Sequence, residues 1–416
     1  MKQYTCDVLV SGGGPGGICA AVSAARNGAD TMLVERYGYL GGMATAGLVF
    51  PFMTRYAGGV QIIDGIFQEL IERLDAKGGY GGPERSAMFD AEAFKLVADE
   101  ICLESGVKLL LHTMVDGVEV DSSLIKKAII HNKSGEGSIS ANIFIDGTGD
   151  ADLAYLAGAP CEKGRASDGL SQPMTLNFRM SGVDKSRMPD REKITELYLK
   201  AREAGRIDCP RNDVLWFHTM RDDEIHFNTT RIICRDATNA EDLTQAEIES
   251  RRQAAQYADW LISDIPGFEN AHLQMTAAQI GIRESRRVVG EYMLTADDLL
   301  STRNFDDCIA RGSYPVDIHD PDGGGTVLKH LAPGESYQIP YRSLVPKKID
   351  NLLIAGRPIS STHEAHSAIR VMPIAAAIGE AAGAAAALCV KDGVSPRQLN
   401  TNKLRATLLA QGANLP

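Results

Sequence analysis

The feature that most constrains the fold is a glycine-rich turn near the start of the chain. An apolar run at residues 8–10 leads into residues 12–17, which read Gly-Gly-Gly-Pro-Gly-Gly. Residues 18–27 then favour a helix, and residues 31–34 favour a second strand. Glycine lets the chain turn sharply, and a helix N-terminus directs N–H groups at whatever binds there. This order of elements predicts a βαβ unit with a dinucleotide site at the turn.

Glu35 ends the second predicted strand, eighteen residues after Gly17. At this distance a carboxylate can accept hydrogen bonds from ribose hydroxyls. Glycine makes up 41 of the 416 residues, so the spacing of Gly12, Gly14 and Gly17 is informative only in its context. The alternative is an ordinary strand-to-helix turn. The strand, the helix and the acid supply the required context, so we favour the dinucleotide interpretation.

Length and composition limit the remaining function classes. A chain of 416 residues exceeds the usual size of a single core, so we expect two domains. The net charge of −11 argues against broad binding to nucleic acid or to an anionic membrane. The eight cysteines lack metal-binding spacing, and we find no signal segment and no apolar run that approaches a membrane span. We therefore expect no metal, no membrane partner, and a cytoplasmic protein with reduced, mostly buried thiols.

The pattern along the chain predicts a split first domain. Residues 1–165 combine helical periodicity at 62–74 and 90–104 with short β runs at 109–111, 115–120, 127–132 and 138–143. A further strand at 143–145 runs into a second glycine turn. Residues 336–416 again show the pattern of the first domain, with an apolar strand at 352–354 and an Ala-rich helix from Pro373 to about Val390.

Residues 166–335 have a different composition and predict a second, α+β domain. We expect strands at 174–180, 214–218 and 224–231, and a long helix at 244–263 that begins with a capping box of Thr244 and Glu247. The predicted fold class is α/β. A Rossmann-like domain, with a parallel sheet, helices and a small antiparallel meander, is interrupted by this substrate domain.

Several motifs in this order resemble the bacterial FAD-dependent oxidoreductases. They are the turn at 12–17, Glu35-Arg36, and residues 40–45, 146–150, 281–287, 354–357 and 379–383. That family shares the glutathione-reductase-type FAD fold and is similar to the fumarate reductase flavoproteins. The match covers nearly the whole chain. It implies FAD as cofactor but does not imply a substrate.

The resemblance also implies the residues that surround FAD. The first glycine turn contacts the pyrophosphate, and Glu35 binds the adenosine ribose. Residues 41–45 line the flavin, Val115 offers backbone to the adenine, and residues 370–372 lie at the pyrimidine edge of the flavin. The implied set is Gly12, Gly14, Pro15, Gly16, Gly17, Glu35, Arg36, Gly41, Gly42, Met43, Ala44, Thr45, Val115, Gly147, Thr148, Gly149, Gly356, Arg357, Arg370, Val371 and Met372.

The properties of a helix N-terminus support the implied position of residues 370–372 at the flavin. A helix that begins at Pro373 leaves unpaired N–H groups at about residues 371–375. A reduced flavin carries negative charge at its N1–C2=O edge, which these groups and the helix dipole would stabilise. The alternative is a helix that only packs, and we favour the flavin role because helix N-termini are natural anion sites.

Four side chains are candidates for chemistry on the substrate: His363, Arg283, His319 and Tyr341. His363 precedes the flavin helix and can transfer a proton near neutral pH, although a structural role fits it equally well. His319 could be a base oriented by a neighbouring carboxylate, or it could belong to a surface loop. Tyr341 is predicted to lie at the floor of the active site.

Arg283 belongs to a basic cluster with Arg286 and Arg287. Such a cluster could bind a substrate carboxylate through paired N–H groups. Glu284 lies among the three arginines, so an internal ion-pair network is the alternative.

Three functions remain open. The first is an FAD enzyme that moves a hydride between flavin N5 and a small polar or carboxylated substrate. The second is a flavin monooxygenase or halogenase that uses O₂, and the third is an electron-transfer subunit of a larger complex. Only one full dinucleotide fingerprint is present, so electrons reach or leave the flavin through the substrate, O₂, a transient nicotinamide, or an electron-donor or acceptor protein. The oligomeric state is left open.

Overall fold

The first βαβ unit forms as the glycine turn predicts. The structure is a computed structural model that describes residues 2–82 and 87–416. Strand β1 (Lys2–Ser11), helix α1 (Pro15–Arg26) and strand β2 (Thr31–Val34) follow one another, and β1 and β2 pair in parallel with Val8 opposite Thr31. Pro15 is the first residue of α1, where its missing N–H costs no hydrogen bond.

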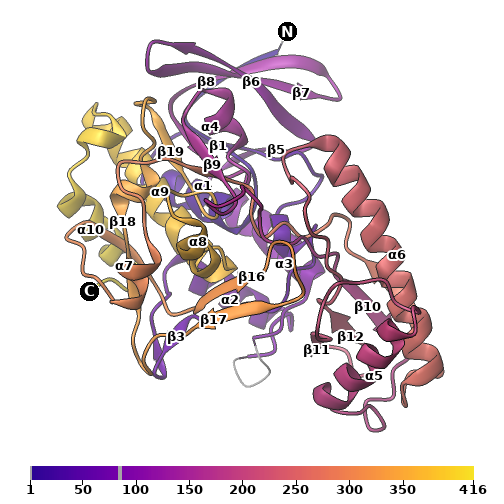
Figure 1. Ribbon diagram of the computed structural model, residues 1–416. Coiled ribbons are helices and arrows are strands. Elements are labelled where there is room, and N and C mark those ends of the chain that lie inside the picture. Colours follow the sequence, from indigo (N-terminus) through magenta and orange to yellow (C-terminus); the bar gives the residue numbers. More distant parts are fainter. Residues whose placement is uncertain (1, 83–86) are drawn as a thin grey trace.

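This unit lies at the centre of a seven-stranded sheet (Figure 1). The strand order is β5-β2-β1-β8-β7-β6, with β19 also paired to β8. The pairs β1–β2, β1–β8, β2–β5 and β8–β19 are parallel, whereas β6–β7 and β7–β8 form an antiparallel meander. The bounds of these strands are β5 Lys108–Leu110, β6 Thr113–Asp121, β7 Leu124–Asn132, β8 Gly135–Asp146 and β19 Leu352–Ile354. The predicted α/β class, with a parallel sheet and a small meander, is confirmed.

Helix α9 (Met372–Asp392) packs directly against α1 through glycines. A Cβ atom added at Gly379 would overlap the carbonyl oxygen of Gly16, and one added at Gly383 would overlap that of Ala20. No side chain larger than hydrogen fits at these two positions, so the backbones of the two helices touch. Helices α2 (Ile66–Ala76) and α3 (Ala91–Glu104) cover the same side of the core.

A second core lies within the predicted substrate domain. It is an antiparallel sheet of order β11-β12-β10-β13 covered by two helices, which Figure 1 shows at the lower right. Aromatic side chains fill it, with Phe178 and Phe227 stacked and Tyr198, Tyr257 and Trp260 beside them. The elements are β10 Phe178–Ser181, α5 Arg191–Glu203, β11 Trp216–His218, β12 Ile225–Phe227, α6 Ala240–Asp264 and β13 His272–Thr276. We call this unit the cap. The boundaries at residues 165 and 335 stay a prediction.

The remaining elements are mostly short and lie outside these two groups. They are η1 Gly42–Ala44, β3 Tyr56–Ala57, β4 Val60–Gln61, α4 Asp152–Leu156, β9 Cys161–Lys163, β14 Arg286–Val288, α7 Ala296–Leu300, β15 Cys308–Gly312, β16 Val316–His319, β17 Thr326–Lys329, β18 Tyr337–Pro340, η3 Tyr341–Leu344, α8 His363–Ile369, η4 Pro396–Gln398 and α10 Thr401–Ala410. Strands β16 and β17 form an antiparallel hairpin.

The predicted start of the long cap helix is wrong. Helix α6 begins four residues earlier, at Ala240, and the side chain of Asn239 accepts a hydrogen bond from the N–H of Asp242. Thr244 therefore lies inside the helix, where its hydroxyl donates to the carbonyl of Ala240. Glu247 instead accepts a hydrogen bond from the N–H of Ile280, 2.7 Å away, and so ties the helix to another segment.

The expectation that no apolar run approaches a membrane span is also wrong for one segment. By length and composition α9 would suffice, because an 18-residue window within it has a mean hydropathy of 1.7. However, 89% of that window is buried inside the protein. Its apolar character follows from its central position in the core, where it contacts α1, α2 and β15.

Glu380 on α9 gives a test of this core. One oxygen of its carboxylate accepts a hydrogen bond from the N–H of Ile66 at the start of α2, 3.0 Å away, and the other has no partner within residues 2–82 and 87–416. Burial raises the pKa of Glu380 to about 7. A carboxyl with a raised pKa stabilises the fold at low pH and loses that contribution as the pH rises towards the folded value.

We therefore expect Glu380→Gln to stabilise the protein increasingly between pH 4.5 and 7, by at most about 3 kcal/mol, with a plateau above that range. Urea denaturation at several pH values measures this difference in the free energy of unfolding. Glu72→Gln, at an exposed position on α2, serves as the control. A pH-independent difference for Glu380→Gln would contradict the interpretation.

Candidate active site

A cavity of about 460 Å³ lies between the carboxyl ends of the parallel strands and the cap. This is where ligands bind in open parallel sheets. Most of the predicted residues line it: Gly12, Gly14, Pro15, Gly16, Glu35, Arg36, Gly42, Met43, Gly147, Thr148, Gly149, Arg283, His319, Gly356, Arg357, Arg370, Val371 and Met372. Segments from both ends of the chain and from the middle thus meet at one site.

The glycine turns form one wall because their backbones touch. A Cβ atom at Gly12, where φ is +98°, would lie 2.5 Å from the carbonyl oxygen of Gly147. A Cβ atom at Gly16 would lie 3.0 Å from the Cα atom of Gly356. Gly14 differs, because its Cβ position has no neighbour closer than Gly42, 4.0 Å away. Gly14 also precedes α1, and no side chain caps that helix. The uncapped N–H groups of α1 therefore face the cavity.

Glu35 is fixed beneath this wall. The residue is only 6% exposed, and its two carboxylate oxygens accept hydrogen bonds from the N–H groups of Gly13 (2.6 Å) and Tyr37 (3.0 Å). Arg36 follows it, lies over the ring of Tyr37, and donates to Gln279. These contacts hold an acid and a cation at the predicted adenosine end.

The N-terminus of α9 forms another part of the wall. Val371 is its N-cap residue, no side chain caps the helix, and Met372 and Ala375 also line the cavity. Pro373 has no N–H, so Met372 and Ile374 provide the unpaired donors of the first turn. The structure thus brings the uncapped N-termini of α1 and α9 to the same cavity, and both favour anionic groups.

Arg357 joins the second and third glycine segments. Its guanidinium donates to the carbonyls of Gly149 (2.7 Å) and Ile282, and it lies 2.5 Å from the carboxylate of Asp150. Burial lowers the pKa of Arg357, and the charge of Asp150 opposes that effect. Because Arg357 uses three of its donors within the protein, it primarily fixes the shape of the turn.

Arg283 lies on the cap side and, among the described residues, donates only to neutral acceptors. Its guanidinium donates to the carbonyl of Pro173 (2.8 Å), the hydroxyl of Thr175 (2.6 Å) and the side-chain oxygen of Asn228 (3.3 Å). It is 9% exposed, and burial together with the charges of neighbouring arginines lowers its pKa well below the usual value. A guanidinium nevertheless stays charged in proteins.

The other two arginines of the basic cluster have acid partners. Arg286 lies 2.9 Å from Asp152, and Arg287 pairs with Glu284. The internal ion-pair network therefore forms for two of the three arginines, and binding of a substrate carboxylate by Arg283 stays a prediction. Two arginines belong to internal ion pairs, and one carries an uncompensated charge at the cavity wall.

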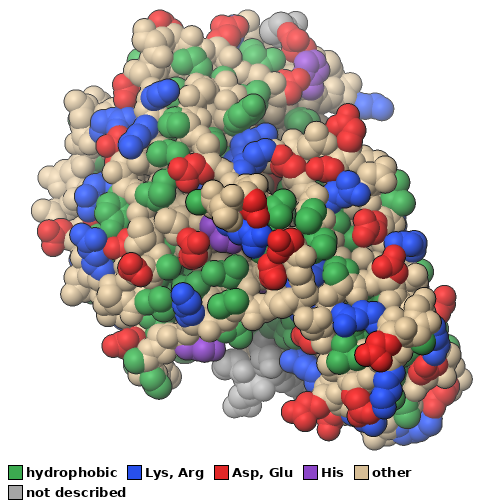
Figure 2. Space-filling view, viewed as in Figure 1, with side chains coloured by type: hydrophobic (Ala, Val, Ile, Leu, Met, Phe, Trp, Pro, Cys, Tyr) green, Lys and Arg blue, Asp and Glu red, His purple; other side chains and the backbone are tan. Residues whose placement is uncertain are grey.

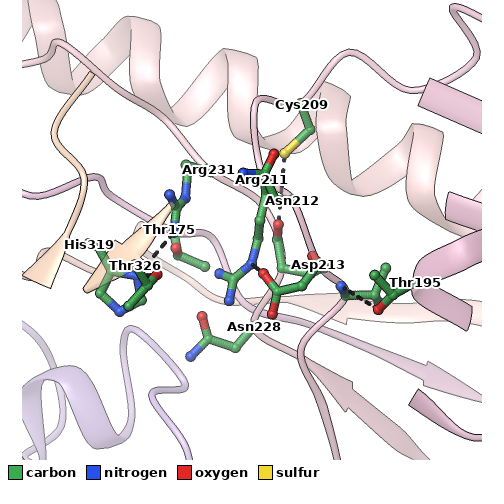
Figure 3. A network of polar contacts seen from close by, with 12 residues as sticks. Thr175, Thr195, Cys209, Arg211, Asn212, Asp213, Asn228, Arg231, His319 and Thr326 are labelled. Atoms are coloured by element: carbon green, nitrogen blue, oxygen red, sulfur yellow. Dashed lines mark hydrogen bonds and ion pairs between the residues drawn. The ribbon is translucent and has the colours of Figure 1, made fainter. Parts of the chain in front are cut away.

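His319 belongs to a hydrogen-bonded network in which both ring nitrogens are engaged. Arg231 donates to Nδ1 over 3.0 Å, and the Thr326 hydroxyl lies 3.2 Å from the same nitrogen (Figure 3). Since Arg231 can only donate, Nδ1 is the acceptor and the proton lies on Nε2, which is 3.4 Å from Asp317. Burial and the charge of Arg283 lower the pKa of His319, so the ring is neutral.

Asp317 is the acceptor at the centre of this network. Tyr314 donates to it over 2.8 Å, and Arg370 lies 3.6 Å from it. Burial raises the pKa of Asp317, but the contacts with His319, Arg370 and Tyr314 outweigh burial and hold it below the usual range. Burial also raises the pKa of Tyr314. Asp317 therefore stays ionised and Tyr314 stays protonated at neutral pH.

Two of the four catalytic candidates do not line the cavity. His363 is buried, with Nδ1 2.9 Å from Glu284 in the network that also contains Arg287. The hydroxyl of Tyr341 donates to the carbonyl of Pro396, 2.9 Å away. Because each is bonded within the protein and away from the cavity wall, we assign neither a catalytic role.

Five residues of the implied FAD shell also lie outside the cavity wall: Gly17, Gly41, Ala44, Thr45 and Val115. Gly17 packs against Gly12, where a Cβ atom would overlap the carbonyl oxygen. The N–H of Gly41 donates to the carbonyl of Gly13, and the Thr45 hydroxyl donates to that of Leu40. Gly17, Gly41 and Thr45 thus support the wall from behind, whereas Val115 lies in the meander, opposite Ile130.

The sequence analysis missed several polar residues of the cavity: Asn177, Arg211, Asp213, Asn228 and Tyr314. They come from the cap and the hairpin region, and no local spacing marks them. Asp317 was noted only as a neighbour of His319. Among the described residues, no three His, Cys, Asp or Glu side chains gather as a metal site would require. Figure 2 shows acidic, basic and apolar side chains interspersed over the face seen in Figure 1.

A family model described as FAD dependent oxidoreductase matches residues 7–408. Thiamine thiazole synthase of Methanococcus maripaludis is 30% identical over 162 residues, which are 36% of this chain and 58% of that protein. The enzyme of Aeropyrum pernix is 32% identical over 133 residues, 31% of this chain and 45% of that protein. The chain spans about half the length of these curated relatives. The solved FAD-dependent chondrochloren halogenase CndH, a myxobacterial protein, has a TM-score of 0.50 at 12% identity, covering 98% of this chain and 79% of that one, a likeness in fold alone.

The open space at Gly14 gives a test of the site. In Gly14→Val the new side chain has room within the protein but projects towards the wall where the pyrophosphate of FAD is predicted. We expect a folded protein that purifies without flavin, whereas we expect the unmodified protein to be yellow. Flavin absorbance and an FAD titration measure the loss, and circular dichroism reports the fold.

Gly325→Val is the matched control, because its Cβ position has no neighbour within 4 Å and no positive φ is required there. Stoichiometric FAD in Gly14→Val would show that the pyrophosphate lies elsewhere.

Proposed function

Because this chain belongs to the FAD dependent oxidoreductase family, we propose that it transfers a hydride between flavin N5 and a small carboxylated substrate bound beneath the cap. The match from residue 7 to residue 408 confirms the family resemblance, the FAD cofactor and the assignment as an enzyme. The substrate and the transfer step are our proposal.

The residues at the cavity fit FAD. We propose that the uncapped N-terminus of α1, with Gly14 and Gly16, binds the pyrophosphate, and that Glu35 binds the adenosine ribose. The uncapped N-terminus of α9 would lie at the N1–C2=O edge of the flavin, where its donors favour negative charge. When bound, FAD supplies a reversible two-electron acceptor.

The observation that carries the substrate proposal is the uncompensated charge of Arg283. A buried charge without a charged partner is costly, and proteins retain such a group where a ligand supplies the counter-charge. A carboxylate matches the paired N–H groups of a guanidinium. Arg283 would therefore bind the substrate carboxylate and hold the molecule against the flavin side of the cavity.

The network around Asp317 would orient the site rather than act as a base. His319 accepts at Nδ1 and carries its proton on Nε2 towards Asp317, so neither nitrogen is free to take a proton from a substrate. In this proposal His319 positions Asp317, and Asp317 in turn fixes Arg370 and Tyr314. The role of His319 thus differs from the base predicted from the sequence.

The two other functions remain alternatives of a different class. An O₂-dependent monooxygenase or halogenase would share this fold, and an electron-transfer subunit would share the cofactor. The likeness to the halogenase concerns fold alone, and the charge at Arg283 favours an anionic substrate. A cytoplasmic location and an electron-donor or acceptor protein as partner stay predictions.

We expect Arg283→Gln to retain FAD but to bind small carboxylates about 10- to 100-fold more weakly, because a charge-assisted hydrogen bond is lost. Perturbation of the flavin spectrum during titration of the holoenzyme measures this affinity. Arg252→Gln, a substitution at an exposed cap arginine paired with Asp208, is the matched control.

Anaerobic assays separate the alternatives. Oxidation of the dithionite-reduced holoenzyme by an unsaturated acid, or reduction of the oxidised holoenzyme by a saturated or hydroxylated one, supports the proposal. Product formation only with O₂ or only with a partner protein would replace it with the second or the third function.

A further inference from the structure

The cap side of the cavity contains polar groups that neither FAD nor Arg283 accounts for. Four of them, Asn177, Arg211, Asp213 and Asn228, line the cavity near Arg283. We call these four residues the cap subsite. Figure 3 shows the side chains of Arg211, Asp213 and Asn228 directed towards one another.

The guanidinium of Arg211 has more N–H donors than the described residues around it provide acceptors. The side chain of Arg211 is 3% exposed, and its Nε donates to Asp213 over 2.8 Å. Among the described residues Nη1 is buried without any hydrogen-bond partner. Its backbone carbonyl accepts hydrogen bonds from Tyr198 and Arg202, so the residue is held in place. Leaving buried donors unpaired is costly unless a ligand completes them.

The two asparagines are oriented by their neighbours. Arg283 donates to the side-chain oxygen of Asn228, which leaves the amide N–H₂ of Asn228 as a donor. Asn177 donates its N–H₂ to the carbonyl of Gly47 over 2.7 Å, and its side-chain oxygen is buried and finds no partner in the described part of the chain. Asp213 has a second oxygen beyond the one bound to Arg211. The cap subsite therefore offers both donors and acceptors.

The cap subsite and Arg283 differ in net charge. Arg211 is paired with Asp213, Arg370 with Asp317, and Arg357 with Asp150, so each of these arginines is compensated. Arg36 lacks an acid partner within salt-bridge distance, but it lies beside Glu35 at the adenosine end. Arg231 also has only neutral partners, two carbonyls and His319, but it does not line the cavity. Among the described residues of the cavity wall on the cap side, Arg283 is the one cation without an acid within salt-bridge distance.

We propose that the substrate is a monocarboxylate whose remaining chain carries hydroxyl groups, which the cap subsite binds. One anionic group matches the single excess charge at Arg283. A hydroxyl both donates and accepts, so it matches the mixed donors and acceptors of Arg211, Asp213, Asn177 and Asn228. A second anionic group would be repelled by Asp213. This inference rests on the proposed function, since it takes Arg283 as the carboxylate site.

Four probes of equal chain length test the inference on the FAD-loaded protein. They are six-carbon aldonates such as gluconate, which carry a carboxylate and hydroxyls; hexanoate, which carries only the carboxylate; adipate, which carries two carboxylates; and the neutral polyol sorbitol. We expect at least one stereoisomer of the aldonate panel to bind about 10-fold or more tightly than hexanoate, because several neutral hydrogen bonds are gained.

Two substitutions separate recognition from folding. Asp213→Asn removes the negative charge at the cap subsite and leaves Arg211 uncompensated. We expect it to abolish the advantage of the aldonate over hexanoate and to increase affinity for adipate. Asn228→Leu should abolish the aldonate advantage without increasing affinity for adipate. Arg252→Gln is again the control.

The outcomes distinguish the two proposals. Equal affinity for hexanoate and every aldonate, or tighter binding of adipate by the unmodified protein, overturns the hydroxylated substrate but leaves Arg283 as the carboxylate site. Unchanged carboxylate affinity in Arg283→Gln overturns the proposed function itself. An aldonate advantage that persists in both Asp213→Asn and Asn228→Leu would place the hydroxyl contacts outside the cap subsite.

Discussion

The contact between α1 and α9 is the constraint on which the site depends. Gly379 and Gly383 let the two helix backbones touch at Gly16 and Ala20. This approach places two uncapped helix N-termini, at Pro15 and at Met372, on one cavity although the sequence separates them by more than 350 residues. A side chain at either glycine would force the helices apart, and their dipoles would no longer converge on one bound group.

The part of the cavity wall formed by the glycine turns and the two helix N-termini could be predicted from sequence because its signals are local. The turn at residues 12–17, the acid at position 35 and the proline at position 373 each combine a motif with the element that it begins or ends. The start of α6 shows the limit of such reasoning. Asn239 and Thr244 both fit a cap, and the helix-forming residues between them let the helix extend to the earlier one.

The cavity residues on the cap side could not be predicted, because the chemistry of each side chain depends on its tertiary contacts. Arg283, Arg286 and Arg287 are equivalent in sequence, yet Asp152 reaches Arg286 and Glu284 reaches Arg287. Only the tertiary arrangement leaves Arg283 with neutral acceptors. Likewise, the position of the proton on His319 follows from Arg231, which is 88 residues away in the sequence. Asn177, Arg211, Asp213 and Asn228 carry no motif at all.

Because the acceptors around Arg283 are neutral, its charge has a consequence for the protein without substrate. A guanidinium enclosed by a carbonyl, a hydroxyl and an amide attracts any small anion that can enter, so chloride or phosphate in the surrounding medium becomes a competitor. Occupancy by the substrate then depends on the ionic composition around the protein as well as on the substrate concentration. The same uncompensated charge that we propose binds a carboxylate makes the pocket responsive to salt.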